Sequence, residues 1–377
     1  MSAIRQSLPS TLGRIRGIYP WVKPPFIVSA PMRVMSGPHL ALAVSKAGGL
    51  GFIGPGAKPE STDADLTTAR DLLSQSPPLL NISHINNNNN NNNNDDGTLP
   101  IGVGFQLWNG NLDIAARAVH DHKPCAAWLF APRNGQAELD QWASRLREAS
   151  PGLQIWTQIG TVVEAIESAE SQARPDVLVV QGAEAGGHGR SKDGMGLAAL
   201  FPEIHDAVRD SPGMALVAAG GIADGRGVAA ALALGAAGVA MGTRFLASTE
   251  ARIQKGYRDE VVRATDGARC TTKTLLYNHL RGTTGWPEQY SPRGIVNRSW
   301  SDHIAGVEFD ELKRLHDEAE RDAGERGWGP EGRLATYAGA AVGLVHDVKD
   351  AGVLVDEMRT EARDIILGLG NLYSHGD

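Results

Sequence analysis

The chain has 377 residues, of which 42% are hydrophobic and 21% charged, a composition typical of a globular protein with a large core. Its formal net charge of −7, without a basic tract, argues against nucleic-acid binding. Two cysteines are too few for a disulfide framework, and no apolar run approaches the ~20 residues of a membrane span.

The N-terminal region combines basic charge with a first strand signal. Residues 1–59 contain seven lysines and arginines but no acid, which is the charge bias of a transit peptide. A short lead-in at residues 12–19 and an apolar run that begins by Phe26 favour folded structure instead. We expect a cytoplasmic protein without membrane or nucleic-acid partners, and import into an organelle stays open as the alternative.

Short apolar runs alternate with helical stretches through residues 1–249. Helical patterns cover residues 38–47, 63–74, 136–148, 162–172 and 225–234. The strand signals are mostly continuous apolar runs, as expected when both faces of a strand are buried. Eight such strands separated by helices predict a (β/α)₈ TIM barrel rather than an open sheet. The predicted strands are 25–30, 50–54, 101–107, 125–131, 153–160, 177–182, 214–221 and 237–242.

Three segments depart from this alternation. The asparagine-rich stretch 83–98 lies within the barrel region and predicts a disordered surface loop, because it cannot bury apolar surface. Residues 250–330 are richer in charge and turns, which predicts a smaller, mainly helical cap or substrate subdomain. Residues 331–377 return to small and apolar side chains. We expect this last segment to pack back on the barrel mouth and to end in a helix near 355–367.

Ligands of TIM barrels bind at the C-terminal ends of the strands. Paired glycines after the seventh strand and a Gly-Thr pair after the eighth predict a phosphate cradle, because backbone N–H groups can face an anion there. The alternative is that these glycines only permit tight turns. The rest of the rim is apolar or neutral, with Met32, Gln158 and Gln181 at strand ends. Such a rim suits a flat ring with a phosphate tail, such as FMN, although other phosphorylated ligands also fit.

Several motifs together resemble the nitronate monooxygenase family. They are APM at 30–32, AGGLGFIG at 47–54, QGAEAGGHGR at 181–190, the stretch from AAGGIADGRG to MGTRF at 218–245, and YAGAAVGL at 337–344. The asparagine-rich insert and the rim GVGFQLW are more similar to fungal members. The resemblance implies an FMN-dependent barrel in which Gln181 and Gly186 touch the flavin and the glycines near strands seven and eight hold its phosphate.

From the rim and the resemblance we predict a set of cofactor-binding residues: Pro31, Met32, Gln158, Gln181, Gly186, Gly187, Gly220, Gly221, Ala240, Met241, Gly242 and Thr243. Two positions depart from the family pattern. Gln106 stands where many members carry asparagine, which puts one flavin contact in doubt. Arg33 follows Pro31-Met32, where smaller or neutral residues are common, and could alter substrate preference.

His188 is the predicted catalytic residue. The family's histidine falls on this position and acts as the base that removes the acidic C–H proton of a neutral nitroalkane; an imidazole suits this role because its ordinary pKa is near neutrality. FMN then takes an electron from the nitronate, and O₂ completes its oxidation to a carbonyl compound and nitrite. The alternative is that His188 has a structural role and forms a hydrogen bond with a backbone carbonyl.

Other residues receive structural or open predictions. Trp108 and Tyr337 either wall a substrate pocket or only pack, and Glu184 is expected to bond N–H groups of its loop. The eleven histidines form no metal-ligand motif with acids or cysteines, so we predict no catalytic metal. A homodimer is compatible with the sequence.

Three rival functions stay open. An FMN-dependent, NAD(P)H-consuming enoyl-thioester reductase shares this barrel and a similar glycine loop. A flavin-free isomerase or aldolase could use the phosphate cradle, and a non-catalytic barrel could sense a phosphorylated ligand.

Overall fold

The computed structural model describes residues 13–75, 97–211 and 213–373. Most of the asparagine-rich loop predicted at 83–98 lies outside these residues. Eight parallel strands close into a barrel, and β9 returns to pair with β1 along its whole length. The TIM-barrel prediction is therefore confirmed, and each predicted strand is present. The strands are β1 (Phe26–Ser29), β2 (Leu50–Ile53), β3 (Leu99–Gln106), β4 (Pro124–Phe130), β5 (Gln154–Ile159), β6 (Val177–Gln181), β8 (Ala215–Ala219) and β9 (Gly238–Met241).

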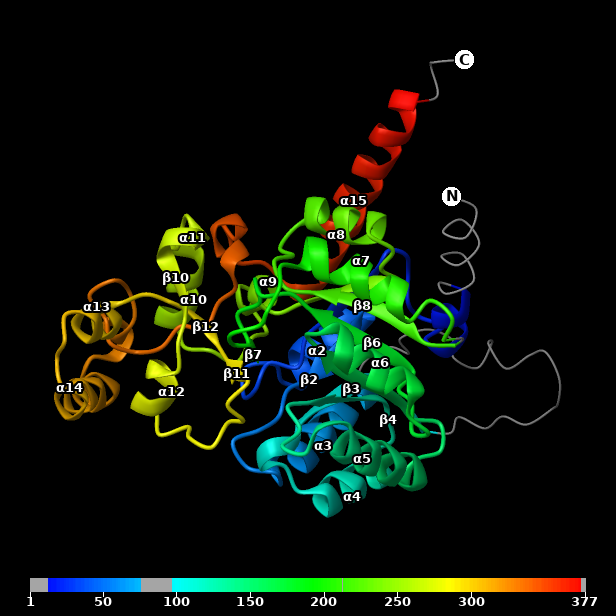
Figure 1. The fold of residues 1–377 in the computed structure, drawn as a ribbon, viewed down its shortest axis with the longest axis horizontal. Coiled ribbons are helices and arrows are strands. Elements are labelled where there is room, and N and C mark those ends of the chain that lie inside the picture. Colours follow the sequence, from blue (N-terminus) through cyan, green and yellow to red (C-terminus); the bar gives the residue numbers. More distant parts are fainter. Residues whose placement is uncertain (1–12, 76–96, 212, 374–377) are drawn as a thin grey trace.

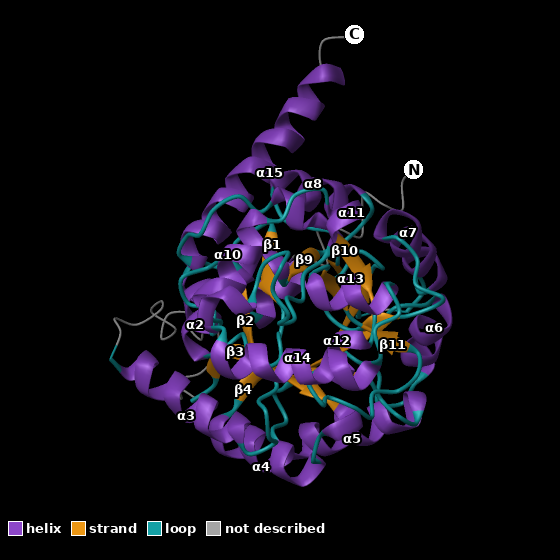
Figure 2. Cartoon of the chain, turned by 90° about the vertical axis from the view of Figure 1, so that its left-hand side faces the viewer, coloured by secondary structure: helices purple, strands orange, loops and turns teal. Residues whose placement is uncertain are grey.

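A ring of helices surrounds the strands, as Figure 2 shows. Local sequence signals start several of them. Thr161 accepts a hydrogen bond from the backbone N–H of Glu164, and Asp224 accepts bonds from the N–H groups of Arg226 and Gly227, as expected of N-cap residues. The ring consists of α2 (Pro38–Lys46), α3 (Ser61–Ser74), α4 (Leu112–His122), α5 (Gly135–Ala149), α6 (Val162–Glu170), α7 (Leu197–Ala207) and α8 (Gly225–Ala233).

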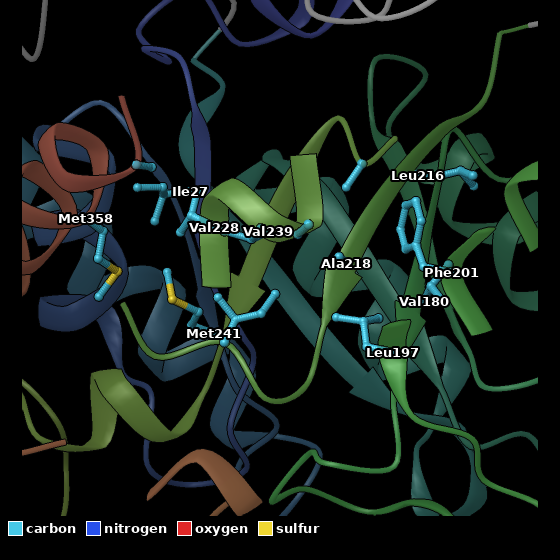
Figure 3. Packing of buried hydrophobic residues seen from close by; sticks show 14 of the residues in the cluster. Ile27, Val180, Leu197, Phe201, Leu216, Ala218, Val228, Val239, Met241 and Met358 are labelled. Atoms are coloured by element: carbon cyan, nitrogen blue, oxygen red, sulfur yellow. The ribbon is translucent and has the colours of Figure 1, made fainter. Parts of the chain in front are cut away.

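The largest apolar layer lies between the barrel and the helices α7, α8 and α15 (Ala351–Tyr373). Figure 3 shows Ile27 and Val239 of the barrel facing this layer, with Val228 of α8 and Met358 of α15 nearby. α15 packs against α8 and α2, then continues beyond them (Figure 1). It is longer at both ends than the helix predicted near 355–367, and its far end carries exposed leucines.

Aromatic rings fill the barrel at the end where its strands begin. The Trp156 indole N–H donates a hydrogen bond to the Tyr19 hydroxyl over 3.0 Å, and the Tyr19 ring stacks near Phe26. The predicted lead-in near residues 12–19 is thus part of the folded core where it is described.

No helix within 13–75, 97–211 and 213–373 is long and apolar enough to cross a membrane.

The elements of residues 250–330, called the cap below, lie at the opposite end of the barrel, as Figures 1 and 2 show. Besides helices, the cap contains short strands that were not predicted. One antiparallel pair ties it to the loop after β6, because β11 (Tyr290–Ser291) pairs with β7 (Gly189–Arg190). The other elements are α10 (Lys255–Arg263), α11 (Gly267–Cys270), β10 (Thr271–Lys273), α12 (Leu276–Leu280), β12 (Arg293–Ile295), α13 (Arg298–Ile304) and α14 (Phe309–Asp322).

Candidate active site

A cavity of about 310 Å³ lies at the C-terminal ends of the barrel strands and extends under the cap. Strand ends, the glycine loop after β6, the loop after α12 and the segment after residue 336 all contribute to its walls. The predicted residues that line it are Pro31, Met32, Gln158, Gln181, Gly186, Gly187, His188, Gly220, Gly221, Ala240, Met241, Gly242, Thr243 and Tyr337. The structure thus brings together every predicted site residue except Trp108.

Trp108 lies in a second layer behind the cavity wall. Its ring packs on Trp286, with ring centroids 4.9 Å apart, and Trp286 is the residue that lines the cavity. The Arg133 Nε donates a hydrogen bond to the Trp108 carbonyl over 2.7 Å. Trp108 therefore supports the wall rather than forming it.

The glycines after β8 have backbone conformations that suit an anion cradle. Gly220 and Gly221 have φ values of +97° and +73°, in the region that L side chains rarely adopt. A Cβ on Gly220 would also lie 3.0 Å from the Gly182 carbonyl oxygen. Thr243 begins the short helix α9 (Thr243–Leu246), and its Oγ1 accepts a hydrogen bond from the Gly339 N–H over 2.9 Å. The Thr243 hydroxyl therefore keeps its own proton to donate to a phosphate oxygen.

Three glutamine amides line the same cavity from the ends of β3, β5 and β6. The Oε1 of Gln106 is buried and has no hydrogen-bond partner among the residues described. The Gln158 Oε1 accepts a bond from the Trp128 indole N–H over 3.1 Å, which fixes its orientation. A buried acceptor without a donor costs free energy unless a ligand supplies one. Many family members carry an asparagine at this position. Gln106 supplies a side-chain amide to the cavity there in place of that asparagine.

The glycines of the loop after β6 allow close packing as well as space for a ligand. A Cβ on Gly186 would lie 2.4 Å from the Gly339 nitrogen, and one on Gly189 would lie 2.3 Å from the Gln181 Oε1. A Cβ on Gly187, by contrast, would meet no atom nearer than 3.9 Å. The loop therefore needs glycine at two positions for packing. The C-terminal segment leaves no room for a side chain at position 186, and Gln181 leaves none at position 189.

His188 is held by the cap. Its ring stacks on Trp286 with centroids 3.5 Å apart and planes 6° apart. Its Nε2 lies 2.7 Å from the Asn278 Nδ2, and Asn278 is almost fully buried on α12. The Nε2 of His188 thus contacts a side-chain amide, whereas the structural alternative predicted a contact with a backbone carbonyl.

Two guanidinium groups make the cavity electropositive. Burial and the charges of Arg33 and Arg281 lower the pKa of His188 to about 3, against a smaller opposing effect of the Asn278 hydrogen bond. Arg33 donates bonds to the carbonyls of Gly56 and Ala57, and burial together with Arg281 lowers its pKa. Within the described residues Arg33 donates to backbone carbonyls and the Arg281 guanidinium lies over the Tyr337 ring, without a carboxylate in an ion pair with either. The cavity thus offers two cations and a neutral imidazole.

A family model described as nitronate monooxygenase matches residues 20–283. The chain belongs to the nitronate monooxygenase family. The fungal nitronate monooxygenase npaC of Metarhizium robertsii is 62% identical over 347 residues, which cover 92% of this chain and 93% of that protein. The resemblance drawn from the motifs is therefore confirmed, and the chain is an oxidoreductase of this family.

Solved structures share the fold of this family member. FabK from Thermotoga maritima superposes with a TM-score of 0.70 at 24% identity, covering 95% of this chain and 98% of that one. A nitroalkane oxidase from Streptomyces ansochromogenes gives a TM-score of 0.67 at 23% identity, covering 94% and 99%. At this identity both likenesses show the fold alone.

The sequence analysis did not predict the residues that the cap contributes to the site. Asn278, Arg281 and Trp286 line the cavity, and so do Trp128 and Phe130 of β4. The only available signal was an arginine and a tryptophan, each next to a glycine, in the turn-rich stretch LRGTTGWPEQY at 280–290. Nothing in that stretch indicates which barrel loop it meets.

Two sets of polar side chains lie outside the cavity. Glu184 accepts hydrogen bonds from the Leu197 N–H, at 2.9 Å to Oε1 and 3.1 Å to Oε2, and so supports the start of α7 as the structural prediction required. The second set consists of three residues on α14, His316, Asp317 and Glu320. Their side-chain atoms that could coordinate a metal ion lie within 4.8 Å of one another. None of these three lines the cavity.

Proposed function

We propose that this nitronate monooxygenase binds FMN and oxidises nitronates, and the nitroalkanes from which they form, with O₂ to carbonyl compounds and nitrite. The observation that carries the proposal is the composition of one cavity. The barrel supplies a glycine cradle and three amides, while Arg33, Arg281 and His188 supply cations and an imidazole. A phosphorylated ring cofactor and a small anionic substrate are the pair of ligands that these groups suit.

The barrel residues fit FMN. Gly220, Gly221 and the Thr243 hydroxyl would hold its phosphate, and the amides of Gln106, Gln158 and Gln181 would pair with polar edges of its ring system. The unpartnered Gln106 Oε1 requires a donor of this kind. When bound, FMN would supply the redox chemistry between the nitronate and O₂.

The two guanidinium groups would bind the nitronate. A nitronate carries its negative charge on the two nitro oxygens, and guanidinium N–H groups form strong charge-assisted bonds to such oxygens. Among the residues described, Arg33 contacts backbone carbonyls and Arg281 the Tyr337 ring rather than a carboxylate, so their charge is available to a ligand. An anionic substrate would also relieve the repulsion between the two cations.

For a neutral nitroalkane, His188 would accept the proton. The C–H bond breaks, its electron pair stays on the nitronate, and the proton moves to an imidazole nitrogen. The low pKa of His188 keeps the imidazole neutral, as a base must be, but makes it weak in the empty cavity. The nitronate formed beside it raises its proton affinity, since an opposite charge favours the imidazolium.

The test begins with the visible spectrum of the purified protein and anaerobic addition of ethyl nitronate. Flavin absorbance that bleaches with nitronate and returns with O₂, with release of nitrite, supports the proposal. A colourless protein that does not take up FMN points to a flavin-free enzyme. Prompt bleaching by NADH, with none by nitronate, points to the enoyl-thioester reductase.

His188→Asn separates the roles of the imidazole. We expect turnover of neutral nitroethane to collapse, while preformed ethyl nitronate is still oxidised. His303→Asn, at an exposed position on α13, is the matched control. Equal losses on both substrates would show that His188 binds or positions the substrate and is not the base.

A further inference from the structure

A chain of side-chain hydrogen bonds leads from Tyr337, in the segment that follows the cap, through Asn278 of the cap to His188. The Tyr337 hydroxyl donates to the Asn278 Oδ1 over 2.9 Å, and the Asn278 Nδ2 lies 2.7 Å from the His188 Nε2. Asn278 is only 1% exposed, so neither end of its amide has water as an alternative partner. The direction in which the protons point along this chain decides which imidazole nitrogen is free.

Tyr337 sets that direction. Burial raises the pKa of the Tyr337 hydroxyl, which therefore keeps its proton, and the Arg281 guanidinium carbon lies 5.6 Å from the centre of the same ring. The hydroxyl donates this proton to the Asn278 Oδ1, so the amide oxygen lies on the Tyr337 side. Asn278 then faces His188 with its NH₂ group.

His188 must therefore accept at Nε2. A neutral imidazole has one N–H and one lone pair, so a bond from the Asn278 Nδ2 to Nε2 leaves the proton on Nδ1. The flat stack on Trp286 holds the ring plane, which limits any tilt that would release Nε2. In this state His188 offers an N–H to a ligand, while its only lone pair is occupied.

We propose that Asn278 is a positioning residue that masks the basic nitrogen of His188 and so favours preformed nitronates over neutral nitroalkanes. The inference rests on the proposed function. A nitronate brings oxygen acceptors that the Nδ1–H and the two arginines can bind without any change in the chain. A neutral nitroalkane gives up its proton only after the Asn278 bond to Nε2 breaks, and the proton then takes the place of that bond.

The size of the effect follows from the bond that must break. One hydrogen bond between neutral groups has a small net strength, so the mask should slow proton abstraction roughly 2- to 10-fold. Such a factor changes the preference between two substrates without abolishing either reaction. The ratio of the two specificity constants is therefore the informative quantity.

The experiment compares kcat/KM for nitroethane and for ethyl nitronate in three proteins. Asn278→Leu removes the donor, and Asn278→Asp replaces it with a group that only accepts, which forces the proton onto Nε2 and frees Nδ1. We expect both variants to raise the nitroethane-to-nitronate ratio roughly 2- to 10-fold. A ratio that is unchanged or falls would overturn the inference. Asn109→Leu and Asn109→Asp, at an exposed position outside the cavity lining, are matched controls.

Two further measurements keep the test independent of a damaged variant. In ¹⁵N-histidine-labelled wild-type protein, the resonances that disappear in His188→Gln should show a protonated Nδ1 and an unprotonated Nε2 at pH 7; a protonated Nε2 would contradict the proposal. Wild-type turnover of ethyl nitronate tests the proposed function separately, so a failed ratio with intact nitronate oxidation refutes only the role of Asn278.

Discussion

The replacement His188→Gln should make the protein less sensitive to acid. His188 has a pKa of about 3 in the folded protein because of burial and the nearby charges of Arg33 and Arg281, whereas an unfolded chain has the ordinary value of 6.5. As the pH falls below 6.5, the unfolded state takes up a proton that the folded state refuses. The contribution of His188 to stability is therefore complete above pH 6.5 and is lost as the pH falls toward 3.

The magnitude follows from the two pKa values. Between pH 7.5 and pH 5, one group with these values lowers the free energy of unfolding by about 2 kcal/mol through proton uptake by the unfolded state. Since the His188 ring is partly exposed in the cavity, this is an upper figure. A glutamine does not titrate, so the variant should lack this part of the acid destabilisation whatever its stability at pH 7.5.

Urea unfolding of the FMN-loaded proteins at pH 7.5 and pH 5, followed by far-UV circular dichroism, measures the difference. We expect the wild type to lose 1–2 kcal/mol more than His188→Gln between the two pH values, in roughly the range set by linkage. His303→Gln, at an exposed position, controls for the loss of a histidine as such. Equal losses in wild type and His188→Gln would refute the argument that burial of the ring and the charges of Arg33 and Arg281 keep this imidazole neutral.

Three other predictions concern the cavity and the surface. Gly221→Ala should weaken FMN binding at least several-fold, measured by fluorescence titration, because φ is +73° there; Gly152→Ala, in open space, should not. Arg281→Met should raise KM for ethyl nitronate roughly tenfold with a smaller change in kcat, because one charge-assisted bond is lost. If the exposed end of α15 pairs two copies, sedimentation will show a homodimer that Leu369→Ser and Leu372→Ser together dissociate; these leucines are 54% and 73% exposed.

The barrel half of the site was predictable because its signals are local. Each strand is a short apolar run, and the residue after it points toward the mouth whatever the rest of the chain does. Gly220 and Gly221 follow β8, and Gly242 and Thr243 follow β9, so the sequence alone places them together once the barrel is assumed. The same logic places Gln181 at the end of β6.

The cap half was not predictable, because its contacts join distant segments through weak elements. Asn278 lies 90 residues after His188 in the chain, yet their side chains are in contact. The pairing that helps bring them together involves β7 and β11, each only two residues long. Strands of that length carry no periodic pattern, so no sequence signal specifies which loop the cap meets. The length of α15 was underestimated for a related reason, since its last turns bury little apolar surface.

The division between barrel and cap also bears on why the motifs alone left the reaction open. Every residue that would hold FMN comes from strand ends or from the glycine loop, and FabK from Thermotoga maritima shares the fold of that barrel. The groups that would meet the substrate have two origins, because Arg33 and His188 come from loops of the barrel, whereas Asn278, Arg281 and Trp286 come from residues 250–330. Two cations and a neutral imidazole favour a small anion with its charge on adjacent oxygens. The choice of substrate in this family member is therefore expected to depend on the cap as well as on Arg33 and His188, and exchanges confined to the cap should change specificity while FMN binding is retained.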